Sequence, residues 1–584
     1  MTNQEIARIF YEISEYLEMQ DVQFKPRAYE KAAIAIEGLD ENINDIYKKE
    51  GIKGLDKIPA VGKGIAEKIE ELIKTDHLKY YERLKKKMPV NLNELTAVEG
   101  IGPKMVKDLY KELKIKNIDE LEKAAKAGKI RDLEGFGKKT EENILQGITF
   151  LKKSGGRFIL GFVMPQVREI EKRIKNLKEV KQAVVSGSIR RKKETVGDGD
   201  ILVTASSEKS AKEISDFFVN MPEVTHVYSY GKTRSSVRLK NGMDFDLRVV
   251  PEENFGSALQ YFTGNKSHNI ELRKIAIKKG LKLNEYGILK GKKQIAGKTE
   301  EEVYKILGLK WMEPELRTNT GEIEASLQQS RGKSNGLPKL IGYNDLKGDL
   351  QIQTNWSDGS NTIEEYAQEA MKLGLEYIVI TDHTKGLAMT GGLDEKRLKK
   401  QGKEIDKINA KLKKQGKKFV ILKGAEVNIK KDGSLDIDNK TLRKLDVVGI
   451  AVHSGFKTLE KEMTERIIRA MKNPHADILF HPTGRVIQKR PSYALNIEKI
   501  IKAAKETGTI LEINAYPDRL DLRDKHVRIA IESDVKLSID SDAHSITHLH
   551  YLEFGIAQAR RGWAEKKDIV NAWPLDKFLK FLKE

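Results

Sequence analysis

The chain has 584 residues and a formal net charge of +19, and it contains no cysteine. At about 150 residues per domain this length predicts roughly four domains, and a hydrophobic fraction of 39% excludes wholesale disorder. The missing cysteines exclude disulfides, cysteine-ligated zinc and thiol nucleophiles. No apolar run approaches the roughly 18 residues of a membrane span, and the polar amino terminus differs from a secretory signal, so we expect a cytoplasmic protein without membrane contacts.

The charge balance gives the first positive indication of function. Lysine and arginine total 106 against 87 acidic residues, and the pI is near 9.4. The excess is spread through folded sequence rather than held in a basic tail, as expected for a long groove that follows a phosphate backbone. Because 33% of the residues are charged, a lysine- and glutamate-rich thermophilic surface is the alternative interpretation.

Residues 1–150 read as almost entirely helical and contain a repeated turn, at 59–64, 98–102 and 133–137. Glycine lets the backbone approach a ligand closely, and the helix that follows each turn offers free N–H groups to a phosphate. The three turns resemble helix-hairpin-helix modules, which hold a DNA backbone without reading its sequence. The predicted DNA-binding residues in the turns are Gly62, Lys63, Gly64, Gly100, Gly102, Gly135 and Gly137.

Between residue 156 and about residue 314, short β-rich runs alternate with helices. Asp198 and Asp200 alternate at the start of one predicted strand, so both carboxylates project from one face, and Asp246 lies in another strand. Three carboxylates on neighbouring strands can hold two Mg²⁺ ions about 4 Å apart and support in-line phosphoryl transfer. An isolated Asp-X-Asp pair is more often a simple turn, so the interpretation depends on its context.

That context is the upstream block Gly-Ser-X-Arg-Arg, in which Gly187, Ser188 and Arg191 offer donors to nucleotide phosphates. The block and the Asp-X-Asp pair together resemble the palm of the X-family DNA polymerases, the group that contains polymerase beta. The resemblance implies that the three aspartates are catalytic ligands of two Mg²⁺ ions, which Mn²⁺ can replace. It also implies dNTP as substrate.

The segment after the palm resembles that family's nucleotide-binding helix, through Tyr261, Phe262, Gly264, Asn269 and Arg273. The resemblance implies that the two aromatic residues flank the sugar of the nucleotide. It places Asn269 at the minor-groove edge of the base and Arg273 on the template side.

The amino terminus resembles the small lyase domain of the same family, through Lys25, Tyr29 and Lys68. The resemblance implies that Lys68 forms a Schiff base with an abasic sugar, with Lys25 and Tyr29 around the 5′-phosphate. A lysine nucleophile needs a depressed pKa, which neighbouring cations can provide. The alternative is that Lys68 only binds phosphate.

Residues 318–345 are polar and aperiodic, as linkers are, and predicted strands and helices alternate beyond them. Regular alternation predicts a parallel sheet closed into a barrel, whose active site collects at the strand ends. Most of the 11 histidines lie in this segment, which suggests a metal site. The candidate metal ligands are Asp358, His383, Glu426, His453, His481, Asp542 and His544.

This pattern resembles the PHP (polymerase and histidinol phosphatase) domain, which is fused to X-family polymerases in bacteria and archaea. The resemblance implies a distorted α/β barrel that binds Zn²⁺ or Mn²⁺ and acts as a 3′-to-5′ exonuclease. The family's first motif is usually Asp-Leu-His-X-His, but Gln351 and Gln353 stand at its histidine positions. Glutamine is a weak, neutral metal ligand, so we expect an incomplete site and a weakened hydrolase, with a purely structural barrel as the alternative.

The predicted fold is multidomain α+β, with a helical helix-hairpin-helix region, a nucleotidyltransferase palm and a distorted α/β barrel. The predicted units are 1–85 (lyase-like), 86–155 (helix-hairpin-helix), 156–250 (palm), 251–317 (nucleotide-binding), 318–345 (linker) and 346–584 (PHP).

We expect a template-directed polymerase that fills short gaps in DNA repair. It would bind gapped or nicked DNA and dNTP as a monomer, in the prokaryotic cytoplasm at the nucleoid. One alternative is a PHP-dependent 3′-end hydrolase or AP endonuclease, against which the paired glutamines weigh. Another is a non-catalytic DNA-binding scaffold, against which the intact aspartate triad weighs. A template-independent transferase is a lesser variant.

Overall fold

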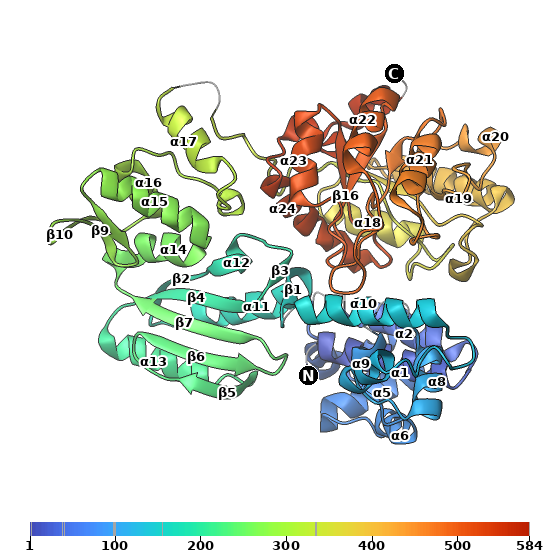
Figure 1. The fold of residues 1–584 in the computed structure, drawn as a ribbon, viewed down its shortest axis with the longest axis horizontal. Coiled ribbons are helices and arrows are strands. Elements are labelled where there is room, and N and C mark those ends of the chain that lie inside the picture. Colours follow the sequence, from blue (N-terminus) through green and yellow to red (C-terminus); the bar gives the residue numbers. More distant parts are fainter. Residues whose placement is uncertain are drawn as a thin grey trace.

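The computed structural model describes residues 1, 3–37, 39, 41–96, 98, 101–154, 156–332 and 336–582, so the predicted DNA-binding residue Gly100 lies outside the described residues. Figure 1 shows a helical N-terminal lobe, a central lobe built on an open sheet, and a C-terminal barrel. Of the helices in the described residues, none combines the length and the apolar character needed to cross a membrane.

Amphipathic helices build the N-terminal lobe, as the spacing of their apolar residues predicts. They are α1 Asn3–Met19, α2 Lys25–Glu37, α3 Ile43–Glu50, α4 Ile52–Asp56, α5 Lys63–Thr75, α6 Lys79–Lys87, α7 Leu92–Thr96, α8 Pro103–Leu113, α9 Ile118–Lys126 and α10 Lys138–Ser154. One core extends from Ile6 to Ile148, and the hydroxyl of buried Tyr16 donates to the carbonyl of Val90 at 3.1 Å. Segments 1–85 and 86–155 therefore pack as one unit, because their apolar helix faces bury each other.

A five-stranded mixed sheet in the order β2-β4-β7-β6-β5 forms the first part of the central lobe. Its elements are β1 Phe158–Ile159, α11 Leu160–Lys175, β2 Val180–Val185, α12 Gly187–Arg190, β3 Thr195–Val196, β4 Asp198–Ala205, α13 Glu208–Val219, β5 Val224–Ser229, β6 Arg234–Leu239 and β7 Asp244–Val250. Phe245 of β7 packs on Phe218 of α13, with ring centroids 6.2 Å apart. Because side chains alternate across a strand, Asp244 and Asp246 project from the opposite face.

A small subdomain completes the central lobe. Its elements are η1 Glu252–Asn254, α14 Phe255–Thr263, α15 Lys266–Lys278, β8 Lys282–Asn284, β9 Gly287–Lys290, β10 Lys293–Ala296, α16 Glu300–Ile306, η2 Pro314–Leu316 and α17 Glu322–Ser330. Helix α17 lies inside segment 318–345, which the sequence predicts to be a linker. Its Ile323 is 6% exposed and joins the subdomain core with Met312. The sequence pattern did not predict this helix, because only a few apolar side chains attach it to the subdomain core and its other residues are polar.

Seven parallel strands form the C-terminal barrel in sequential order, as the β/α alternation predicts. The strands are β11 Gly348–Asp349, β12 Tyr377–Ile380, β13 Val420–Asn428, β14 Val447–Ala451, β15 Ile478–Leu479, β16 Ile510–Asn514 and β17 Leu537–Asp540. A parallel bridge between Ile352 and Ala543 joins the two ends of the sheet. Tyr377 points into the barrel and stacks on Phe578, with ring centroids 5.8 Å apart. The barrel interior is therefore a packed core, and a site can form only at its rim.

Helices and short turns surround the strands of the barrel (Figure 1). They are α18 Ile363–Lys372, η3 Ala388–Thr390, α19 Glu395–Lys414, α20 Asn439–Leu442, α21 Glu460–Met471, α22 Ile497–Thr507, α23 Asp524–Glu532, η4 Ile546–Tyr551, α24 Leu552–Arg561, η5 Lys566–Asp568, η6 Val570–Ala572 and α25 Leu575–Phe581.

The central lobe and the barrel meet along α11. A Cβ atom added to Gly161 would lie 2.5 Å from Cβ of Pro517, so the close approach of the two lobes requires glycine. On the barrel side, Arg485 is 2% exposed and holds Glu194 of the central lobe through two hydrogen bonds of 2.7 and 3.1 Å. A bidentate pair has a defined geometry, so this contact favours one relative orientation of the two lobes.

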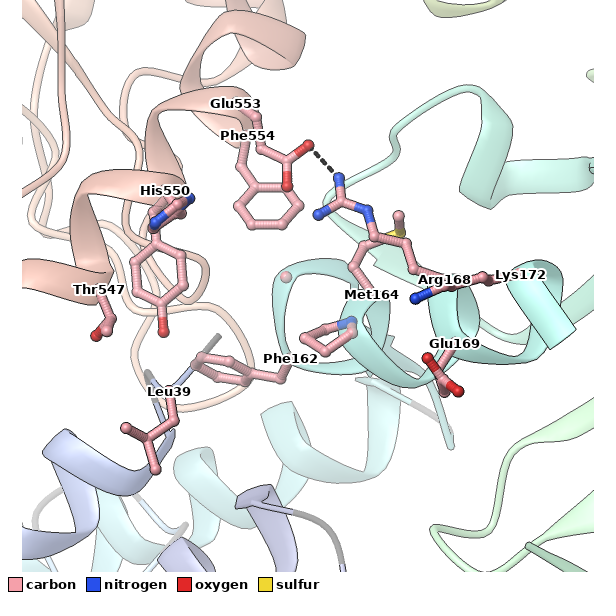
Figure 2. Close-up of a pocket in the computed structure, with 13 residues that line it drawn as sticks. Leu39, Phe162, Met164, Arg168, Glu169, Lys172, Thr547, His550, Glu553 and Phe554 are labelled. Carbon is pink, nitrogen blue, oxygen red and sulfur yellow. Dashed lines mark hydrogen bonds and ion pairs between the residues drawn. The ribbon is translucent and has the colours of Figure 1, made fainter. Parts of the chain in front are cut away.

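All three lobes contribute to a cavity of about 320 Å³ beside this contact (Figure 2). Leu39 of the N-terminal lobe, Phe162 of α11 and Phe554 of the barrel line it. At its edge Arg168 pairs with Glu553 at 2.5 Å.

Candidate active sites

The three predicted catalytic carboxylates lie together on the open face of the central sheet. Strands β4 and β7 pair in parallel, and their register places Asp200 directly opposite Asp246, with Asp198 two residues earlier on the same face. Burial and the negative charges of Asp198 and Asp246 raise the pKa of Asp200 to about 6. Such a cluster of hard oxygen ligands fits divalent cations, which would relieve the repulsion among the carboxylates.

Two arginine side chains lie close to the carboxylate of Asp246. The Nη2 atom of Arg234, on β6, lies 3.0 Å from Oδ2 of Asp246, and that of Arg248 lies 3.6 Å from the same oxygen. Sequence reasoning missed Arg234, because only the antiparallel register of β6 with β7 brings it to the site. The pairing offers a guanidinium close to the position of a reacting phosphate.

Gly187 and Ser188 begin α12, directly above the carboxylates. Gly187 has a φ of +67°, and a Cβ atom added to it would lie 3.0 Å from Oδ2 of Asp200. Glycine is therefore needed here both for its backbone conformation and for space. The start of α12 presents backbone N–H groups and the Ser188 hydroxyl next to the aspartates, as nucleotide phosphates would require.

Arg191 follows α12 and spans the gap to the small subdomain. Its guanidinium donates to the carbonyl of Thr263, and Gly264 leaves room for it, since a Cβ atom there would lie 3.2 Å from Nη1. Burial and the charge of Arg317 lower the pKa of Arg191 to about 10. The side chain remains a cation at neutral pH, within the region where triphosphate binding is predicted.

The predicted aromatic pair lies in the same region, whereas the side chain of Asn269 forms hydrogen bonds within the protein. Phe262 lies under the guanidinium of Arg248, which is 4.3 Å from the ring centroid, and Tyr261 packs edge-on against Phe262. Asn269 is 8% exposed and donates to the carbonyl of Tyr261 at 2.7 Å. Arg273 lies one helical turn further along α15 and is exposed. Asn269 thus positions the aromatic pair in this structure, and its contact with a base stays a prediction.

A buried ion cluster that sequence reasoning missed connects the nucleotide region to the small subdomain. Glu300 accepts two hydrogen bonds of 2.8 Å from Arg190 and further ones from the fully buried Arg317. Burial raises the pKa of Glu300, but the charges of the two arginines outweigh it and hold that pKa far below the ordinary range. Because Arg190 directly precedes Arg191, the cluster helps to position Arg191, which is predicted to bind the triphosphate.

The glycines of the N-terminal turns face open space. A Cβ atom added to Gly62, Gly64, Gly102, Gly135 or Gly137 would meet no atom of the described residues within 4 Å. Packing therefore does not explain these glycines. Gly135 has a φ of +79°, which favours glycine, and the other turns leave room for the close approach of a ligand. Gly62 and Gly102 are the N-caps of α5 and α8, so both helix N-termini, and the exposed Lys63, are accessible to phosphates.

Lys68 is half-buried on α5, beside a pair of aromatic rings. Its Nζ donates to the carbonyl of Gly64 at 2.7 Å and lies 5.3 Å from the ring centroid of Tyr80, on which Tyr29 stacks. Burial is the larger cause, and the charge of Lys25 a smaller one, of a lowered pKa for Lys68. A lowered pKa is what a Schiff-base nucleophile needs.

In the barrel, Glu426 is the centre of the predicted metal-ligand cluster. His453 and His481 approach its Oε1 at 3.0 and 2.9 Å, and Nδ1 of His383 lies 3.4 Å from its Oε2. Burial raises the pKa of Glu426, but the facing imidazoles outweigh it and hold that pKa well below the ordinary range. Asp358 lies 3.6 Å from His383 and 3.7 Å from His544.

Hydrogen-bonding side chains occupy the space where further ligands were expected. The amide nitrogens of Gln351 and Gln353 donate to Oε2 of Glu426 at 3.1 and 2.8 Å. Arg519 pairs with the predicted ligand Asp542 at 3.2 Å, and Asn514 donates to the same oxygen at 3.1 Å. Sequence reasoning missed Asn514, which is the last residue of strand β16, and Arg519, which follows that strand.

The remaining donors fit metal ions at two positions. Ligand atoms of Asp358, His383 and His544 lie within 4.8 Å of one another, as do those of His383, Glu426 and His453. Three buried atoms beside them lack a hydrogen-bond partner among the described residues: Nδ1 of His383, Nδ1 of His481 and Oε1 of Gln353. Buried polar atoms without partners are costly, and metal coordination would satisfy them. A divalent-metal site of reduced size is therefore compatible with this cluster.

Comparison with known proteins matches family models to each lobe. A helix-hairpin-helix domain model covers residues 1–78, and a tandem helix-hairpin-helix model covers residues 92–148. The DNA polymerase beta palm matches residues 164–233, and the DNA polymerase beta thumb matches residues 258–318. The PHP domain model matches residues 349–516.

Among individual relatives, the DNA polymerase/3′-5′ exonuclease PolX of Bacillus subtilis (strain 168) is 36% identical over 588 residues, which covers the full length of both chains. A probable phosphatase of Thermoanaerobacter sp. (strain X514) is 32% identical over 237 residues, 38% of this chain and 89% of the relative. DNA polymerase lambda of Rattus norvegicus is 28% identical over 291 residues, 44% of this chain and 48% of that protein.

Proposed function

Because this chain belongs to the X-family DNA polymerases that carry a C-terminal PHP domain, we propose that it is a template-directed repair polymerase acting on gapped or nicked DNA. The polymerase activity and the DNA and dNTP substrates follow from the family. Binding of the DNA backbone is supported by the glycine turns of the N-terminal lobe, which are suited to a phosphate backbone. We further propose a monomer in the bacterial cytoplasm.

The register that aligns Asp200 with Asp246 is the observation that carries the proposal. Asp198, Asp200 and Asp246 would hold two divalent cations, for which Mg²⁺ is the best fit and Mn²⁺ a substitute. Cations held there would neutralise the triphosphate and lower the pKa of the primer hydroxyl. Asp246 accepts the proton of the 3′-hydroxyl, whose oxygen forms a bond to the α-phosphorus while the bond to pyrophosphate breaks.

Residues around the carboxylates position the nucleotide for this displacement. The N–H groups at the start of α12, the Ser188 hydroxyl and Arg191 hold the phosphates in line. Tyr261 and Phe262 flank the sugar, and Gly264 keeps the backbone clear of Arg191. Their placement within one region of the central lobe supports these roles.

For the barrel we propose a 3′-to-5′ exonuclease weakened by Gln351 and Gln353. Asp358, His383 and His544, with Glu426 and His453, would hold one or two ions, and Zn²⁺ or Mn²⁺ suits a mixed imidazole and carboxylate donor set. The two amide donors on Glu426 compete with a cation for that carboxylate. The relative named as a probable phosphatase, which aligns with 38% of this chain, favours phosphoester hydrolysis as the chemistry of the barrel.

Primer extension on a one-nucleotide-gapped, 5′-phosphorylated duplex tests the proposal. Template-matched addition with Mg²⁺ should disappear in Asp198→Ala and persist in Asp216→Ala, a control carboxylate on α13. A lane with Mn²⁺ and no dNTP reports the exonuclease, which Asp198→Ala should leave unchanged. Extension that survives Asp198→Ala contradicts the palm mechanism. Gapped DNA bound without growth or shortening would favour a scaffold.

A further inference from the structure

A basic cavity lies on the outer side of the barrel, away from the central lobe (Figure 1). It has a volume of about 510 Å³ and lies among α19, β13 and the segment around α20, on the right in Figure 1, with the central lobe on the left. Six lysines and three carboxylates line it: Lys396, Lys399, Lys403, Lys423, Lys440 and Lys444, with Glu395, Asp406 and Asp438. None of them belongs to the polymerase or metal-ligand sets.

The carboxylates of this cavity are already engaged, whereas most of its lysines are not. Asp406 pairs with Lys423 at 2.7 Å, and Glu395 pairs with Lys385, which lies outside the lining, at 2.6 Å. Asp438 caps α20 by accepting from the backbone of Thr441 at 2.8 Å. In the described part of the chain, no carboxylate lies within ion-pair distance of the amino groups of the other five lysines. The cavity therefore carries uncompensated positive charge.

The shape of the cavity favours a small anion over a nucleic acid. Double-stranded DNA presents about one charge every 1.7 Å along a line, so it binds to basic stripes. These lysines instead surround one concavity of a size typical for small-molecule ligands, with the buried Leu398 and the half-buried Leu445 in its lining. Gly402, in the middle of α19, adds no side chain to the wall.

We propose that this cavity binds a small molecule bearing several linked phosphates, such as a nucleoside triphosphate or inorganic polyphosphate. Lys399 and Lys403 lie one helical turn apart on α19 and face the cavity together, as phosphates along a chain require. Lys440 contributes from α20 on another wall.

The same helix is attached to the loop that carries Asp358. Gln401, which is 2% exposed, donates from Nε2 to the buried Asp382 at 2.5 Å, and Asp382 in turn accepts from the backbone of Thr354 at 2.7 Å. Trp356 donates to Glu404 of α19 at 3.2 Å. A ligand that draws the lysine face of α19 inward therefore acts on loop 354–358, and so on the hydrolase site. This second part rests on the proposed function of the barrel.

Calorimetry with the full-length protein tests the binding site. The experiment uses inorganic tripolyphosphate, without divalent metal and in an Arg191→Ala background that weakens binding at the palm. The variant Lys399→Gln/Lys403→Gln/Lys440→Gln should weaken binding about tenfold or more, which is at least about 1.4 kcal/mol. The control Lys407→Gln/Lys413→Gln/Lys414→Gln removes equal charge from exposed α19 positions outside the cavity and should bind normally.

Equal weakening in both triple variants, or in neither, overturns the proposal. Comparison with dATP distinguishes the ligand sources, since equal affinity indicates that the phosphate chain alone is recognised, and tighter binding of dATP indicates that the nucleoside contributes. The proposal is also overturned if tripolyphosphate does not bind while binding of a single-stranded oligonucleotide depends on the three lysines. The surface would then be a DNA contact.

Hydrogen exchange of the metal-free protein tests the connection to the hydrolase site separately. Tripolyphosphate should slow exchange in residues 395–405 and in residues 354–361. If only residues 395–405 are protected, the proposed connection to the hydrolase site is wrong, and the proposed binding site still holds. Neither measurement depends on polymerase or exonuclease turnover, so failure of the catalytic proposals is distinguishable from failure of this one.

Discussion

The amide nitrogen of Gln353 donates a 2.8 Å hydrogen bond to Oε2 of Glu426 at the centre of the barrel's ligand cluster. Glu426 is fully buried, and its other carboxylate oxygen contacts His453 and His481. A buried carboxylate without a cation needs compensating donors. Gln353 is one of these donors, and its hydrogen bond would compete with a cation for Oε2 of Glu426.

Imidazoles at positions 351 and 353 should therefore strengthen metal binding in the barrel. We expect Gln351→His/Gln353→His to tighten Mn²⁺ binding about tenfold or more, because neutral imidazole is a better ligand than a carboxamide. Calorimetric Mn²⁺ titration measures the affinity, and primer shortening without dNTP measures the exonuclease. Gln415→His, on an exposed position after α19, serves as control. Unchanged Mn²⁺ affinity in the double variant would contradict the explanation that the glutamines weaken metal binding because they replace imidazole ligands.

The raised pKa of Asp200 predicts a pH dependence of metal binding. With a pKa of about 6, this carboxyl is increasingly protonated as the pH falls from 7 to 5, and protons then compete with Mg²⁺. Primer extension at subsaturating Mg²⁺ should fall by about tenfold over this range and recover when Mg²⁺ is raised. A loss that added Mg²⁺ does not reverse would assign the pH effect to another group.

The same shift predicts an effect on stability. A carboxyl whose pKa is higher in the folded than in the unfolded state destabilises the fold as the pH rises through that interval, and the effect is complete above about pH 6. Asp200→Asn should therefore raise the melting temperature of the metal-free protein at pH 7.5 by a few degrees while abolishing extension. Calorimetry at pH 4.5 should show a smaller difference. A variant that melts lower than the parent at pH 7.5 would refute this reading of the site.

The buried cluster around Glu300 predicts a structural effect on nucleotide binding. Glu300→Gln leaves the cations of Arg190 and Arg317 without their counter-charge, which typically costs about 3 to 5 kcal/mol. We expect a lower unfolding temperature and a raised KM for dNTP, because Arg190 positions Arg191. Glu301→Gln, one residue away and exposed, should change neither quantity. Equal effects of the two substitutions would argue against the cluster.

The environment of Lys68 predicts covalent trapping. Borohydride reduction should link the protein to a 5′-abasic substrate, and Lys68→Arg should abolish the product while retaining the charge. Lys63→Arg, at the exposed neighbouring turn, should trap normally. The lowered pKa of Lys68 also predicts that trapping extends to a lower pH than an exposed lysine would allow. Trapping that persists in Lys68→Arg would leave Lys68 as a phosphate contact only.

Local patterns along the chain were sufficient to predict the helical N-terminal region, the strand that carries Asp198 and Asp200, and the barrel. Each depends on periodicity and on residues close together in sequence. Helix α17 was not predicted, because few apolar residues attach it. The tertiary structure adds that the helices on either side of the predicted 85/86 boundary share one core, because the sequence pattern does not show that Tyr16 and Val90 come into contact.

The amino-acid sequence alone was sufficient to identify the polymerase chemistry of this protein, because motifs such as Gly-Ser-X-Arg-Arg and Asp-X-Asp keep their ligand types within a short span. Only the tertiary structure decided which distant groups act on those ligands. Arg234 reaches Asp246 through strand register, and Arg519 reaches Asp542 at the end of a neighbouring barrel strand. Contacts of this kind depend on where strands and lobes pack against one another, and packing joins residues whose separation along the chain carries no signal.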